Sequence, residues 1–89
     1  MDDFQSVWAR ITSLSGETFH TKTGIPFSYD AAGSSVVLRN TERNLPRSQF
    51  RQALARFPIS GPGDLQDLQG PSYMYAILSD PRVRESQLR

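Results

Sequence analysis

Cysteine is absent from this chain of 89 residues, and histidine, lysine and tryptophan each occur once. Without cysteine the chain can form no disulfide, zinc ribbon, iron–sulfur cluster or thiol nucleophile. Its one imidazole, His20, has no partner at a recognised metal-ligand spacing and no neighbour in the sequence that would orient it as a general base. We therefore expect no metal and no cofactor.

Long hydrophobic runs are also missing. The longest apolar stretch, residues 73–78, is far shorter than the roughly 20 residues that span a bilayer. The Met-Asp-Asp start lacks the basic and apolar regions of a secretory signal. The sequence therefore predicts a cytoplasmic protein with no membrane partner.

The small size of the chain argues against an enzyme. Residues 1–89 make one domain, and a domain this small rarely encloses the pocket of several hundred cubic ångströms that small-molecule enzymes use. The tripeptide Lys22-Thr23-Gly24 indicates a hairpin turn and not a catalytic motif. Residues 61–63 resemble a phosphate-binding loop, but Pro62 lacks one of the backbone N–H donors that such a loop needs. We therefore expect a non-enzymatic accessory or binding domain.

Periodicity predicts an α+β fold. The positions of Phe4, Val7, Trp8 and Ile11 place one apolar stripe on a helix over residues 3–12. A period of two then predicts strands at residues 17–22, 25–31 and 36–39, paired as a three-stranded antiparallel meander.

Two more helices are expected after the strands. One begins near Pro46 or is capped by Ser48, continues to Phe57 and covers the sheet. After a single helical turn at residues 64–69, residues 73–78 form either a short helix, which Pro71 favours, or a buried strand. The expected order is thus α-β-β-β-α-α, followed by a polar tail, residues 82–89, that frays.

Positive charge is concentrated in the middle of the chain. Residues 31–60 carry five arginines against one glutamate, although the whole chain has a net charge of only +1. Nine of the ten basic residues are arginine, which suits bidentate contacts with phosphate or carboxylate. The alternative is that the bias reflects codon usage in the source.

Helical geometry selects three of these arginines. At about 100° per residue, Arg47 and Arg51 lie on one flank of the second predicted helix, and Arg43 can join them from the preceding loop, whereas Arg56 lies on the opposite side. We call Arg43, Arg47 and Arg51 the arginine ridge and predict that it binds nucleic-acid phosphates. Polar side chains nearby can reach bases or phosphates: Asn44, Gln49 and Gln52. The alternative is an ordinary solvated helix face.

A second hypothesis is a protein-interaction module or a homodimer. Residues 73–78 are apolar on nearly every side. If the segment is helical, Tyr73 and Ile77 share one face and Tyr75 lies away from that face. Tyr75 is therefore the candidate interface residue, with arginines at the rim of the contact.

Overall fold

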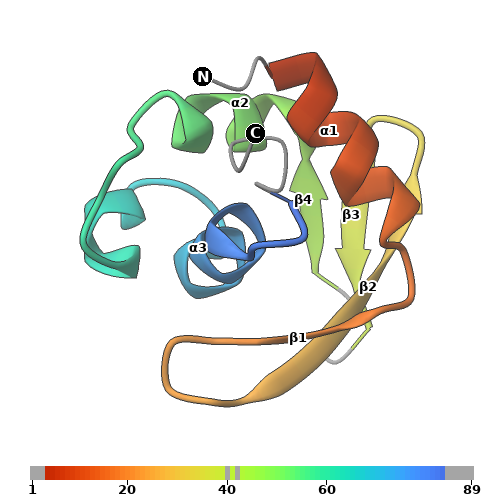
Figure 1. Ribbon diagram of the computed structural model, residues 1–89, viewed down its shortest axis with the longest axis horizontal. Coiled ribbons are helices and arrows are strands. Elements are labelled where there is room, and N and C mark those ends of the chain that lie inside the picture. Colours follow the sequence, from red (N-terminus) through yellow and green to blue (C-terminus); the bar gives the residue numbers. More distant parts are fainter. Residues whose placement is uncertain (1–3, 40, 42, 84–89) are drawn as a thin grey trace.

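The computed structural model describes residues 4–39, 41 and 43–83, and folds them into an α+β domain (Figure 1). Within these residues three α-helices, one short 3-10 helix and a four-stranded antiparallel sheet are present. The elements are α1 (Phe4–Ser13), β1 (Thr18–His20), β2 (Pro26–Ala32), β3 (Ser35–Leu38), β4 (Asn44–Pro46), α2 (Arg47–Leu54), η1 (Pro62–Leu65) and α3 (Pro71–Ser79). The predicted α+β class is confirmed, but the predicted number of strands is wrong by one.

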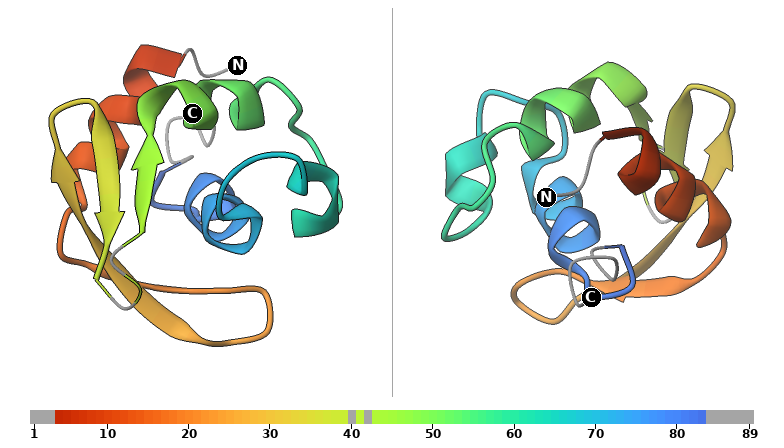
Figure 2. Two further views of the ribbon diagram at one scale, coloured as in Figure 1. Left: turned by 180° about the vertical axis from the view of Figure 1, so that it is seen from behind. Right: turned by 45° about the horizontal axis from the view of Figure 1, so that its top comes forward.

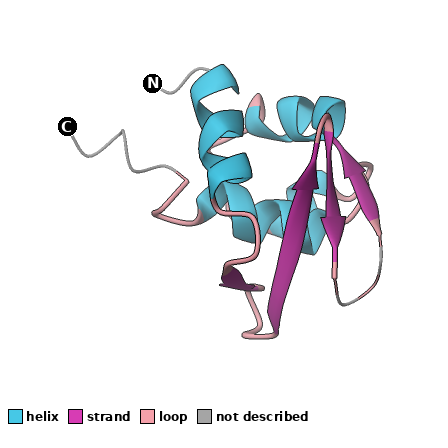
Figure 3. Cartoon of the chain, turned by 90° about the vertical axis from the view of Figure 1, so that its right-hand side faces the viewer, coloured by secondary structure: helices cyan, strands magenta, loops and turns pink. Residues whose placement is uncertain are grey.

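All three α-helices lie on the same side of the sheet, as the side view in Figure 3 shows. Alternation along the strands explains why, because one face is apolar and the other is polar. The apolar face contributes Phe27, Tyr29, Val36, Leu38 and Leu45 to the core, all of them buried. The helices add Val7, Ile11, Phe50, Ala53, Met74, Ala76, Ile77 and Leu78. None of the described α-helices covers the opposite face of the sheet, which carries Asp30.

Helix α1 confirms the predicted N-terminal helix. Val7 and Ile11 are buried, whereas Phe4 and Trp8, on the same stripe, are only half-buried. Gly16 follows the helix with a φ of 89°, a left-handed conformation that suits glycine, and its N–H donates to the Tyr29 carbonyl at 2.7 Å. The end of α1 is thereby attached to the sheet.

The first three strands form the predicted meander. Strand β2 pairs with β1 through its first half, with Phe19 opposite Phe27, and with β3 through its second half, with Tyr29 opposite Leu38. Gly24, with a φ of 94°, makes the predicted turn between β1 and β2. Pro26, expected at a strand start or an edge, is the first residue of β2.

Strand β4 is the correction to the predicted topology. It pairs antiparallel with β3, and Val36 lies opposite Leu45. The sequence gives little sign of this strand, because it has three residues and only Leu45 is a large apolar side chain. Helix α2 begins directly after β4, as the expected start near Pro46 requires: Pro46 is the N-cap residue, whereas Ser48, the alternative cap, lies inside the helix.

Helix α2 is shorter than predicted. It ends at Leu54, and the chain turns before Phe57, a residue that precedes Pro58 and is therefore disfavoured in helical conformation. Phe50 is fully buried, whereas Leu54 and Phe57 are half-buried against the core. The helical turn expected at 64–69 is instead η1, which begins at Pro62, yet its Leu65 and the following Leu68 are buried as expected.

The structure decides the open question about residues 73–78 in favour of a helix. Helix α3 begins at Pro71, and four of its residues are buried. The predicted tail begins with two residues that are attached to the domain: Val83 is fully buried, and Arg82 binds the Thr18 carbonyl at 2.9 Å. The rest of that tail, 84–89, lies outside the described residues.

Candidate nucleic-acid interface

Arg47 and Arg51 of the arginine ridge both lie against one aromatic ring, that of Phe4. They lie one helical turn apart on α2, which contacts α1; Figure 2 shows the two helices side by side near the start of the described chain. Each guanidinium carbon lies 5.0 Å from the centroid of the Phe4 ring, and that of Arg47 is also 6.0 Å from the Trp8 ring. The two guanidinium carbons are therefore no more than 10 Å apart.

A chain of aromatic contacts connects these cations to the core. Phe4 stacks on Trp8 with ring centroids 6.0 Å apart, and Trp8 packs against the buried Phe50 at 5.6 Å. An exposed cation–π contact is worth about 0.5–1 kcal/mol, enough to favour one position of an otherwise mobile arginine. Both guanidinium groups are thus held on the surface before any ligand arrives, which lowers the entropic cost of binding one.

Two of the other arginines, Arg39 and Arg56, are each paired with an aspartate. Arg39 binds both oxygens of Asp30 at 2.9 and 2.6 Å and holds the pKa of that carboxyl below its usual value. Arg56 binds Asp67 in the same way, at 2.6 and 2.8 Å, and lowers its pKa to about 2. Their charges are therefore already compensated.

Arg82 and Arg10 also have internal roles. Arg82 pairs with Asp80 at 3.0 Å and lies 4.3 Å from the centroid of the Phe19 ring. Arg10 donates from Nε to the Val83 carbonyl. Both arginines fasten the segment after α3 to the rest of the domain.

The arginine ridge differs from these four arginines. Neither Arg43, Arg47 nor Arg51 forms an ion pair with any carboxylate in the described part of the chain. The structure separates Arg43 from Arg47 and Arg51, however, because Arg43 precedes β4 and Arg47 follows this strand. Four extended residue steps span about 13 Å. The ridge is thus a close pair with a third arginine at the opposite end of β4.

Of the three polar residues predicted to assist the arginine ridge, one is hydrogen-bonded within the domain and two are exposed. Gln49 accepts a hydrogen bond from the backbone N–H of Gln69 at 3.1 Å, so its amide oxygen is used within the domain. Gln52 is exposed on α2, and Asn44 is exposed on β4. Asn44 and Gln52 therefore remain available to a ligand.

Packing accounts for the apolar segment that suggested an interaction module. Met74, Ala76, Ile77 and Leu78 are buried inside the domain. Tyr75 is half-buried, and its ring stacks on Phe57 with centroids 6.2 Å apart and an interplanar angle of 19°. The interface role of Tyr75 stays a prediction, but the apolar character of α3 no longer requires it.

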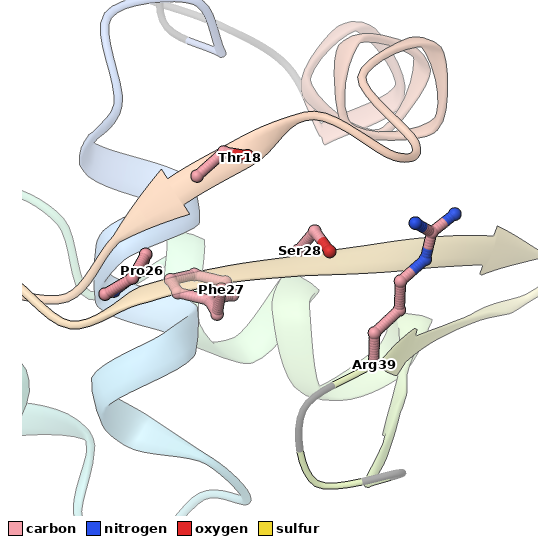
Figure 4. A pocket seen from close by; sticks show the side chains of 5 residues that line it. All are labelled: Thr18, Pro26, Phe27, Ser28 and Arg39. Atoms are coloured by element: carbon pink, nitrogen blue, oxygen red, sulfur yellow. The ribbon is translucent and has the colours of Figure 1, made fainter.

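An open hollow of about 350 Å³ lies on the β1–β2 side of the sheet (Figure 4). Its lining consists of Thr18, Pro26, Phe27, Ser28 and Arg39. The one charged side chain among them, that of Arg39, is engaged with Asp30. The lining thus includes two hydroxyl groups and one arginine that is already paired, and no carboxylate or imidazole is among the lining residues.

The described residues also offer no metal site. Across them, no cluster of three or more His, Cys, Asp and Glu side chains is placed to hold a metal ion. His20 is exposed on β1. None of the described helices has the length and hydropathy to cross a membrane.

Comparison with known proteins gave no match: no family model, no curated protein and no solved structure is similar to this chain.

Proposed function

We propose that this protein is a small nucleic-acid-binding domain that contacts phosphates through Arg47 and Arg51. The observation that supports the proposal is the pair of guanidinium groups held 5.0 Å from the Phe4 ring with no ion pair to a described carboxylate. Two positive groups in this position repel each other, and an anion between them removes that repulsion. Guanidinium groups bind phosphate oxygens in a bidentate manner.

The partition of the arginines strengthens the proposal against the alternative of a solvated helix face. Arg39, Arg56 and Arg82 each pair with an aspartate, so carboxylates are available on the domain surface and three of the seven described arginines pair with them. Arg47 and Arg51 are placed on an aromatic ring instead. A codon-usage bias can raise the number of arginines, but it does not explain which of them lack a carboxylate.

Fluorescence anisotropy with labelled single-stranded and duplex DNA, over a salt series, tests the proposal. We expect wild-type binding that weakens as salt rises. For single strands, Arg47→Gln with Arg51→Gln should lower the affinity and reduce the slope of log K against log salt by about 1.4, or about 0.7 for each lost phosphate contact.

The double variant Arg39→Gln with Arg56→Gln is the matched control. It removes the same charge from two arginines that are already paired with aspartates. An equal loss of affinity in both double variants would mean that binding follows net charge, and the proposed site would be wrong. Absence of wild-type binding at low salt would exclude a nucleic-acid function.

A further inference from the structure

The free edge of β4 connects the two parts of the arginine ridge. β4 is the last strand of the sheet, and it leads directly into α2 (Figure 1). Leu38 N–H donates to the Arg43 carbonyl at 2.8 Å, and Arg47 N–H donates to the Ser34 carbonyl at 2.8 Å. In an antiparallel ladder, alternate residues direct their backbone groups toward the partner strand. These residues are Leu45 in β4 and Arg43 and Arg47 on either side of the strand.

Asn44 and Pro46 consequently direct their backbone groups away from β3. The N–H and C=O groups of Asn44 have no hydrogen-bond partner among the described residues. Pro46 has no N–H to offer, and the strand has only three residues. A short edge that contains proline is a poor template for another β-strand. This edge therefore suits an occupant other than a β-strand.

Arginine residues lie at both ends of the β4 edge. Arg43, just before β4, is exposed, and Arg47 and Arg51 lie beyond the other end of the strand. Between them Asn44 offers two backbone groups and a side-chain amide, which can donate and accept hydrogen bonds. The backbone from Arg43 to Arg47 defines a line about 13 Å long, as estimated from the rise of an extended chain.

We propose that one strand of nucleic acid lies along β4, with phosphates at Arg43 and at the Arg47–Arg51 pair and unpaired bases facing Asn44. This inference rests on the proposed function and adds the form of the ligand and its direction on the surface. At about 3.4 Å per stacked nucleotide, the line corresponds to about four nucleotides.

A duplex fits the same surface less well. Helix α2 has only eight residues, and Phe4 of α1 lies against the flank that carries Arg47 and Arg51, so this flank is not free to enter a major groove. Three cations on one line also match one backbone rather than the two that border a groove. Bases paired within a duplex would not be open to Asn44.

A length series of oligothymidylates, shorter and longer than about four nucleotides, tests the inference. We expect wild-type affinity to rise steeply until the oligonucleotide spans the line and then to level off. Arg43→Gln should cost about three- to fivefold in affinity only for oligonucleotides that reach it. Arg47→Gln with Arg51→Gln should weaken binding at every length.

The control Arg39→Gln has the same change in charge as Arg43→Gln, but the Arg39 side chain is bound to Asp30 on β2. If Arg43→Gln has no larger effect than Arg39→Gln at any length, the inference is wrong, while the proposed function still stands on the Arg47–Arg51 pair. If that pair makes no difference either, the proposed function fails. A duplex that binds as tightly as the single strand, or an acidic peptide that does so, would overturn the assignment of the ligand.

Discussion

Tyr29 fastens α1 to the sheet, and its hydroxyl group can be removed without disturbing the packing. The hydroxyl donates to the Ile11 carbonyl at 2.6 Å, and the side chain is fully buried. Tyr29→Phe keeps the ring and its contact with Phe19. The Ile11 carbonyl retains a bond of 3.2 Å from Leu14 N–H. We therefore expect a loss of about 1 kcal/mol in the free energy of unfolding, the typical net value of one hydrogen bond.

Urea denaturation followed by the fluorescence of Trp8, the single tryptophan, measures this loss. In a domain of this size about 1 kcal/mol corresponds to a decrease in Tm of about 4–8 °C. Tyr75→Phe is the matched control, because it removes the same atom from a half-buried ring whose hydroxyl bonds to no described residue. We expect it to cost less than about 0.5 kcal/mol. Equal losses in the two variants would refute the role given to the Tyr29 hydroxyl.

The dependence of stability on pH provides an independent check. Burial raises the pKa of Tyr29 above its ordinary value near 10. Since the folded pKa exceeds the unfolded one, the stability due to the neutral phenol is complete below about pH 10 and is lost as the pH rises further. The advantage of the wild type over Tyr29→Phe should therefore shrink above about pH 10. A constant difference would contradict burial of the phenol.

The helices were predictable because their signals are local. Val7 and Ile11 recur at the spacing of a helix and are buried as that spacing requires. Residues 73–78 were ambiguous, since an apolar run of six residues fits a buried strand as well as a helix. The proline at the first position of α3 was the informative signal, because proline is tolerated there.

Strand β4 was not predictable from local sequence. Its pairing depends on Val36 lying opposite Leu45, nine residues along the chain, and a strand of three residues has no period of its own to detect. This one omission also misplaced Arg43. A loop before α2 allows Arg43 to return toward Arg47, whereas an extended strand moves it about 13 Å away.

The candidate site was predictable in part for the same reason. Helical angles placed Arg47 and Arg51 on one flank of α2, which the structure shows to be the flank that faces Phe4. The contact itself joins residues more than forty positions apart and has no signal in the sequence. Nor does the sequence reveal that Arg39 and Arg56 are paired with aspartates, because those pairs depend on how the strands and turns are arranged.

Two further predictions test the surface and the core. Asp67→Asn removes the carboxylate that binds Arg56. Because this bond lowers the pKa of Asp67 to about 2, its contribution to the stability of the fold is present above about pH 4 and is lost as the pH falls toward 2. The difference in Tm between the wild type and Asp67→Asn should disappear over that interval, and a difference unchanged by acid would contradict the pair. Gly70→Ala should destabilise more than Gly33→Ala, although both glycines have similar φ values of 57° and 64° and both variants pay about 1–2 kcal/mol for a left-handed alanine. A Cβ at Gly70 would lie 3.0 Å from Leu45 Cδ2, whereas one at Gly33 meets no atom within 4 Å. Leu45 is fully buried and has little room to move, so equal decreases in Tm would contradict this close approach of α3 to β4.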